Sequence, residues 1–246
     1  MSEYILSTYD DLMRSFYPLI EKFFIKHKIG DDHNHLHAKK VAEHAFQACL
    51  VHTPQLTNEQ VYAILLAALG HDTDDHKLFD TKEYQNIRKL LSDFGQSEEI
   101  IELVVKLIDL VSTTKHKDNR YGLDDWYFIV RYADRLDAIG SEGINRTIQY
   151  TVHKGRKLYC YNTPRPTTLD ELYEVATIER YNNYKNDSLS MIDHCFDKLL
   201  RIGDEFISNP YFNSLTTLRK RQVEDFVLWF GRKGHITLEE CWEYMR

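Results

Sequence analysis

The stretch VYAILLAALGHD, residues 61–72, decides how this chain folds. It is apolar almost all round as far as Gly70, and this pattern predicts a central, buried helix. Thr57 and Gln60, which have the spacing of a capping box, mark the start of that helix. Its end, His71-Asp72, is a pair of ionisable residues, which are costly to bury unless a partner compensates their charge. The pair therefore indicates a bound cation; the alternative is that the helix simply ends there and the pair meets solvent.

The rest of the chain has the pattern of an all-helical protein. Only ten glycines and five prolines occur in 246 residues, and they cluster between segments with a helical period. Besides the helix that ends at Gly70, helices are expected near residues 7–27, 34–52, 81–94, 97–113, 123–138, 141–152, 168–185, 188–208, 214–233 and 237–245. The stretch 153–167, HKGRKLYCYNTPRPT, has no helical period and holds two prolines, which predicts a long loop or a small hairpin covering a site.

Composition narrows the class of protein. A hydrophobic fraction of 43% over 246 residues suffices for one large domain or for a core plus a small lobe. The net charge of -7 argues against general nucleic-acid binding and against a membrane-surface role. Four cysteines without CxxC spacing are typical of reduced thiols, so we expect a cytoplasmic protein. We expect neither a signal peptide nor a membrane span, because the first residues lack a basic-then-apolar pattern and the apolar runs are short.

Three histidines alternate at the start of the helix expected over residues 34–52: His33, His35 and His37. A helix cannot turn all three to one face, so at most two of them point inward. His37 lies one turn before Val41, on the apolar side, and is the preferred metal ligand. His33 and His35 are candidates for contacts behind the ligands or with substrate. The alternative for all three is a solvated helix start.

Charged residues follow His71-Asp72 directly. An acid three or four positions after a ligand can reach a metal-bound water, so Asp75 is the candidate general base or orienting group. Lys77 supplies a point charge suited to a phosphate oxygen. The alternative for both residues is a charged surface loop.

Asp134 interrupts the apolar face of the helix expected over residues 123–138. A carboxylate at that place suits a divalent ion. The alternative is an ion pair within the helix, between Asp134 or Asp137 and Arg131 or Arg135. Arg146, in the next expected helix, adds positive charge that a phosphate would use.

The order His37, His71-Asp72, Asp134 resembles the signature of the HD-domain superfamily of metal-dependent phosphohydrolases. The likeness extends over roughly residues 15–230. It includes the motifs His33-x-x-x-His37-x-x-Lys40-Val41, Leu65 to Lys77, Ala133 to Thr147 and His194-Cys195-Phe196-Asp197-Lys198-Leu199-Leu200. The subgroup that they resemble is the small, single-domain one that includes bacterial nucleoside-triphosphate pyrophosphohydrolases.

The resemblance implies an all-α HD-domain helical bundle with additional C-terminal helices. It implies a single domain over residues 1–246, with a core at about 15–150 and a C-terminal extension at about 168–246. It also implies one divalent metal ion (Mn, Ni, Co, Fe, Zn or Mg) with the ligands His37, His71, Asp72 and Asp134. Asp75 is expected nearby, and the residues expected to face phosphate are Lys77, Arg135 and Arg146.

Two positions depart from the subgroup pattern. Tyr132 stands where members often carry an additional Asp. The absence of that Asp weakens the site if its carboxylate contacts the metal or the metal-bound water. Gly70 stands where a larger apolar residue is usual, and we expect looser packing at that helix end.

The activity that the resemblance favours is release of pyrophosphate from a nucleoside triphosphate by a metal-activated water. Among enzymes, the alternatives are a nucleotide monophosphatase and a cyclic phosphodiesterase. Outside catalysis, they are a non-catalytic nucleotide-binding regulator and a helical scaffold for protein partners. The expected partner is a small-molecule nucleotide or phosphate ester, without nucleic acid or membrane, and a homodimer is left open.

Overall fold

A computed structural model describes residues 2–30, 34–76, 78–112, 122–185, 187–204 and 208–246. These residues form helices joined by turns and loops, and they contain no β-strand. The prediction of an all-α fold is therefore confirmed. Contacts divide the chain into two compact units. The first unit comprises Met1–Asp134 and Phe206–Asn213, and the second comprises Arg135–Glu205 and Ser214–Arg246. The description as a single domain stays a prediction.

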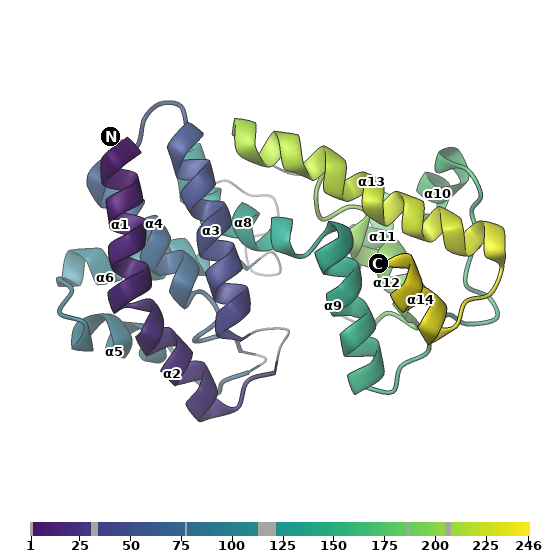
Figure 1. Cartoon of the computed structure of the whole chain (residues 1–246), viewed down its shortest axis with the longest axis horizontal. Helices are drawn as coiled ribbons and strands as arrows, with labels where there is room; N and C mark the ends of the chain where they lie inside the picture. The colour runs from purple at the N-terminus through teal and green to yellow at the C-terminus, as the bar shows by residue number, and fades with distance from the viewer. Residues whose placement is uncertain (1, 31–33, 77, 113–121, 186, 205–207) are drawn as a thin grey trace. The chain divides into compact units, whose positions relative to one another are not determined.

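The first unit is organised around α4, Asn58–Gly70. This helix packs against α1, Ser2–Ser15, α3, His35–Val51, and α6, Glu98–Asp109 (Figure 1). The capping box is present, because Thr57 Oγ1 accepts from the backbone N–H of Gln60 and Gln60 Oε1 accepts from that of Thr57. All residues from Ala63 to Gly70 are buried, as expected for a helix that is apolar on every side. The predicted central helix is confirmed.

The remaining elements of the first unit are shorter. They are α2, Tyr17–His27, α5, Gln85–Asp93, the 3-10 turn Asp125–Phe128 and α8, Ile129–Asp137, whose last three residues belong to the second unit. The helix predicted over residues 7–27 is in fact two helices, α1 and α2. Pro18 in the first turn of α2 has no N–H to donate and its ring would clash with the preceding turn, so one helix cannot run through it.

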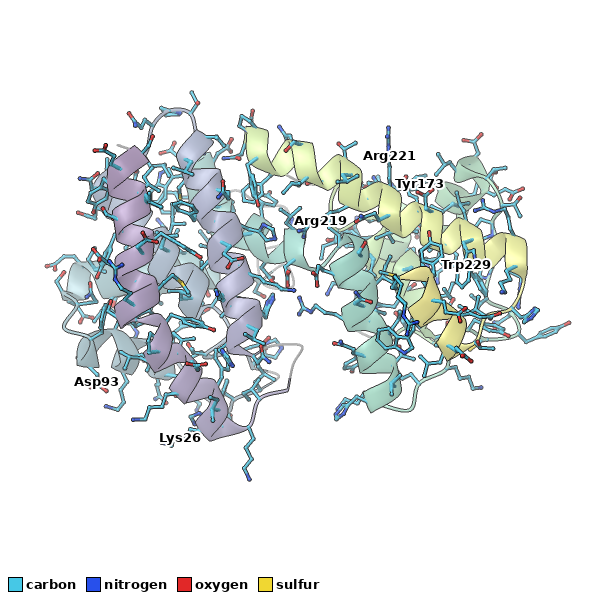
Figure 2. The ribbon with its side chains drawn as sticks, viewed as in Figure 1. Lys26, Asp93, Tyr173, Arg219, Arg221 and Trp229 are labelled. Atoms are coloured by element: carbon cyan, nitrogen blue, oxygen red, sulfur yellow. The ribbon has the colours of Figure 1, made fainter. Side chains whose placement is uncertain are left out.

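The second unit has its own core. Its elements are α9 (Gly140–His153), α10 (Leu169–Val175), α11 (Ile178–Asn182), α12 (Met191–His194), the π-helical turn (Cys195–Leu199), α13 (Pro210–Lys233) and α14 (Leu238–Tyr244). Of α13, only the part from Ser214 onward belongs to this unit. Phe196, Phe226 and Phe230 are fully buried within it. Trp229 on α13 packs on Tyr244 of α14, with ring centroids 4.8 Å apart (Figure 2).

Two longer helices predicted for the second unit are interrupted. The segment 168–185 contains α10 and α11, and the segment 188–208 contains α12 and the π-helical turn. A new cap separates α10 from α11, because Thr177 accepts a hydrogen bond from the Arg180 N–H. Ser190, which accepts one from the Asp193 N–H, caps the start of α12. Among the described helices of both units, none is long and apolar enough to cross a membrane.

Candidate metal centre

His71, the residue directly after α4, is oriented by its own helix. Its Nδ1 lies 2.9 Å from the carbonyl oxygen of Ala68. Since a carbonyl oxygen only accepts, Nδ1 carries the proton of the neutral ring and Nε2 keeps its lone pair. Nε2 is buried and has no hydrogen-bond partner among the residues that the structure describes. A histidine whose second nitrogen is tied to a carbonyl is oriented as metal ligands usually are.

His37 is placed by the cap of α3. Asn34 precedes that helix, and its Oδ1 accepts from the backbone N–H of Leu36 at 2.8 Å and of His37 at 3.3 Å. The His37 side chain is buried, and its Nε2 lies 3.2 Å from Asp134 Oδ1 and 3.7 Å from Asp72 Oδ2. Sequence reasoning missed Asn34, although an asparagine before the histidine-rich helix start is a typical N-cap signal.

The predicted ligands come together at the ends of three helices of the first unit. His37, His71 and Asp134 each offer one ligand atom, and these atoms lie within 4.8 Å of one another. Asp72 lies beside both imidazoles, with its Oδ2 3.4 Å from His71 Nε2. The structure thus gathers all four residues that the sequence pattern singled out.

The imidazole–carboxylate distances fit a divalent ion. Two atoms that each lie about 2.1 Å from one ion are at most about 4.2 Å apart. The imidazole–carboxylate distances run from 3.2 Å for His37 with Asp134 to 3.9 Å for His71 with Asp134, inside that limit. Two imidazole nitrogens in the set favour a transition metal over magnesium. That these residues bind a metal stays a prediction.

Asp75 lies in the turn that follows the ligands. Its side chain is 16% exposed, and its Oδ1 is 3.4 Å from His76 Nδ1. Its own carbonyl oxygen accepts from the N–H groups of Leu78 and Phe79, which fixes the turn. This placement differs from an exposed surface loop, and the predicted catalytic role of Asp75 remains untested. Lys77, predicted to contact phosphate, lies outside the described residues.

The two predicted phosphate-binding arginines belong to the second unit. Arg135 is buried, with 2% of its surface exposed. Arg146 donates to Asp137 Oδ2 at 3.1 Å, and the Asp137 side chain is buried. The charge of Arg146 is therefore already directed at a carboxylate, and a contact of either arginine with substrate stays a prediction.

The neighbouring histidines have other places. His35 Nδ1 lies 2.8 Å from the hydroxyl of Tyr17 and 3.6 Å from Glu21, so its ring links α3 to α2. His33 lies outside the described residues.

The two departures from the subgroup pattern have structural explanations. Tyr132 is buried, and its ring centroid lies 6.2 Å from that of Phe212 and 6.5 Å from that of Phe128. Residues two apart on a helix face different sides, so Tyr132 fills an aromatic core while Asp134 meets the histidines. The expectation of looser packing at Gly70 is wrong. A Cβ at that position would meet the side chain of Ile87 at less than 3.0 Å.

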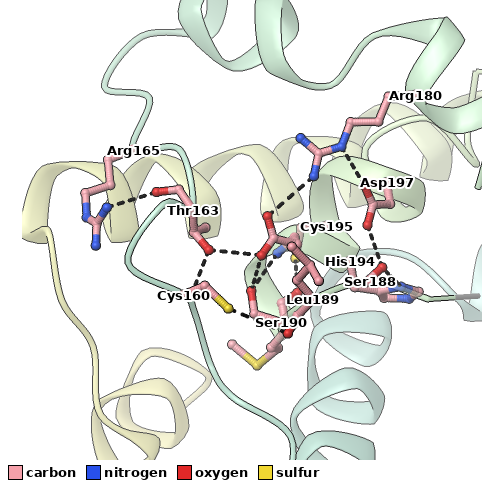
Figure 3. Close-up of polar contacts among 12 residues, drawn as sticks. Cys160, Thr163, Arg165, Arg180, Ser188, Leu189, Ser190, His194, Cys195 and Asp197 are labelled. Carbon is pink, nitrogen blue, oxygen red and sulfur yellow. Dashed lines mark hydrogen bonds and ion pairs between the residues drawn. The ribbon is translucent and has the colours of Figure 1, made fainter.

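The segment 153–167 is irregular after His153, as predicted, and it is fastened within the second unit (Figure 3). Thr163 Oγ1 donates to Asp193 Oδ2 at 2.9 Å, and Ser190 donates to the same oxygen at 2.6 Å. Arg165 donates to the carbonyl oxygen of Gly234 at 2.8 Å. Because Asp193 is also paired with Arg180, the loop is anchored to a buried polar network.

Comparison with known proteins gives relatives that align with most of the chain. No protein-family model matches it. The uncharacterized protein L803 of Acanthamoeba polyphaga mimivirus is 35% identical over 231 residues and aligns with 86% of this chain and 93% of that protein. The uncharacterized protein YpgQ of Bacillus subtilis is 28% identical over 175 residues, 70% of each chain.

Solved structures give the same fold. The structure of Bacillus subtilis YpgQ in complex with ADP has a TM-score of 0.63 at 23% identity, covering 96% of this chain and 99% of that chain. An HD-superfamily hydrolase from Bacillus thuringiensis has a TM-score of 0.64 at 21% identity, covering 93% of this chain and all of that chain.

Proposed function

Because this chain belongs to the same family as the mimivirus protein L803 and has the fold of the HD-domain superfamily, we propose that it is a metal-dependent phosphohydrolase acting on nucleotides. The observation that carries the proposal is the cluster of two imidazoles and two carboxylates at the end of α4. A structural neighbour named as a hydrolase and another solved with ADP support the reaction class and the ligand class.

The roles follow from the chemistry of each side chain. His37, His71, Asp72 and Asp134 hold one divalent ion. When bound, this ion supplies a Lewis acid that lowers the pKa of a water and polarises a phosphate oxygen. Asp75, three residues beyond Asp72, accepts the proton that the attacking water releases.

The substrate that we favour is a nucleoside triphosphate. Water attacks the α-phosphorus, the bond from that phosphorus to the bridging oxygen breaks, and the products are a nucleoside monophosphate and pyrophosphate. Lys77, Arg135 and Arg146 are the proposed cations that offset charge on the phosphate oxygens. Neither a serine nor a cysteine nucleophile is required.

The test is turnover by protein that has been stripped with a chelator and reloaded with single divalent ions. A panel of nucleotides is offered, and pyrophosphate and orthophosphate are measured separately. We expect pyrophosphate from triphosphates with a transition metal, no turnover by His71→Ala or Asp134→Ala, and full turnover by the exposed matched control His235→Ala.

Other results would redirect the proposal. Orthophosphate released from monophosphates would identify a nucleotidase instead. Stoichiometric metal binding without turnover of any nucleotide would favour a nucleotide-binding regulator.

A further inference from the structure

The turn after α4 is tied to the start of α5 by side chains outside the ligand set. Asn86 Nδ2 donates to the carbonyl oxygen of Thr73 at 2.7 Å. Asp74 Oδ1 accepts from the Thr81 hydroxyl at 2.7 Å and from the backbone N–H of Asn86 at 3.0 Å. Asp74 Oδ2 accepts from the backbone N–H of Ile87 at 2.9 Å. One carboxylate therefore satisfies three donors from another segment.

Asp74 serves as the missing N-cap of α5. The residue at the cap position, Tyr84, has φ 59° and provides no side-chain cap, and Glu83 before it has φ 51°. Two consecutive residues other than glycine in the left-handed region are unfavourable, so this helix start needs compensation from elsewhere. The Asp74 carboxylate supplies this compensation, because it accepts hydrogen bonds from N–H groups of the first turn of α5 and interacts favourably with the helix dipole.

The same contacts act on the backbone that carries the metal ligands. Thr73 directly follows Asp72, and its carbonyl is held by Asn86. The Thr73 hydroxyl donates back to the carbonyl oxygen of Gly70 at 2.8 Å, which closes the turn around His71-Asp72. The direction in which both ligands leave α4 thus depends on groups that come from α5 and the segment before it.

We propose that Asp74, Thr81 and Asn86, which we call the α5 brace, are positioning residues for the metal centre. They hold the turn so that His71 and Asp72 face His37 and Asp134 before an ion arrives. This inference rests on the metal site of the proposed function, and it adds residues that the ligand motif does not contain.

Two variants remove the brace with little change of shape. Asn86→Ala removes the side-chain donor to the Thr73 carbonyl oxygen and keeps the backbone N–H that donates to Asp74. Asp74→Asn keeps the size of the side chain and removes its charge and one acceptor. The matched controls are Gln85→Ala, an exposed neighbour, and Asp93→Asn, whose side chain is 60% exposed near the other end of α5 (Figure 2).

The readout is Co²⁺ binding to chelator-stripped full-length protein, followed by visible absorption, with far-UV circular dichroism of the metal-free protein. Loss of a partner behind the ligands typically weakens metal binding by about 10–100-fold, and we expect that loss in both brace variants. We also expect a changed Co²⁺ absorption spectrum and retained helicity. The two controls should match the wild type in affinity and in spectrum.

The proposal would be overturned if Asn86→Ala and Asp74→Asn both kept the Co²⁺ affinity and absorption spectrum of the wild type. This holds even if their thermal stability falls. If either variant does not fold, Thr81→Val, which removes one donor to Asp74, is judged by the same criteria. Wild-type protein that binds no Co²⁺ would overturn both the brace and the metal site. Wild-type protein that binds Co²⁺ but releases no pyrophosphate would overturn only the proposed reaction.

Discussion

Gly70→Ala tests how closely α4 and α5 pack beside the ligands. The added Cβ would lie less than 3.0 Å from Ile87 Cδ1 and 3.2 Å from Ile87 Cγ1, while Ile108 Cδ1 is 3.9 Å away. Gly70 and Ile87 are both buried, so the displaced end of the isoleucine has no solvent to move into.

Two contributions of opposite sign decide how Gly70→Ala changes the free energy of unfolding. Alanine in a helix is more favourable than glycine by up to about 1 kcal/mol. Overpacking a filled core costs about 1–3 kcal/mol. We expect a net loss of about 1 kcal/mol in the free energy of unfolding, which lowers the thermal midpoint of a chain this long by about 2–4 °C.

A double-mutant cycle with Ile87→Val isolates the contact, because valine lacks the Cδ1 atom that the new methyl would meet. Ile87→Val alone should cost about 0.5–1.5 kcal/mol. In the Ile87→Val protein, the methyl group of Gly70→Ala fills the vacated space, so the substitution should be neutral or stabilising. The coupling energy between the two substitutions should therefore be about 1 kcal/mol or more. Urea unfolding of the four proteins measures it. Additive effects, or stabilisation by Gly70→Ala in the isoleucine protein, would show that the new methyl group does not clash with Ile87.

Three further perturbations have defined outcomes. Asn34→Ala removes the cap beside His37 and should cost about 1 kcal/mol in urea unfolding, most of it restored by Asn34→Ser. Gly231→Ala would drive a Cβ into the Pro166 carbonyl, so residues 153–167 should be cleaved faster by protease, and wild-type rates would contradict this. Burial, followed by nearby cations, lowers the pKa of His194 to about 3. The unfolded chain then binds the extra proton below about pH 6.5, so stability falls as pH drops from 7 to 5, by about 2 kcal/mol. His194→Gln should lose that dependence in urea titrations at the two pH values, and an unchanged profile would count against it.

The buried helix that ends in His71-Asp72 was largely predictable because its signals are local. The apolar run of α4, its capping box and His71-Asp72 lie within one helix and its ends, and burial follows from the apolar run. The first helix was less predictable. Leu12, Phe16, Ile20 and Phe24 keep a step of four and are all buried, so the apolar period runs through the break that Pro18 imposes.

Contacts between distant segments were not predictable. Nothing around Asn86 or Asp74 in the sequence indicates that one holds the turn after α4 and the other caps α5. Arg146 carries no local sign that Asp137 accepts from it. The π-helical turn, in which Leu200 N–H donates to the carbonyl oxygen of Cys195 five residues back, likewise depends on packing rather than on propensity.

The stoichiometry of metal binding tests most directly whether His37, His71, Asp72 and Asp134 hold an ion. Chelator-stripped protein is dialysed against Mn²⁺ and the bound metal is counted for the wild type, for His71→Ala and for the control His235→Ala. We expect one ion per chain in the wild type and in the control, and none in His71→Ala. An equal metal content in all three proteins, or none in any of them, would contradict this expectation.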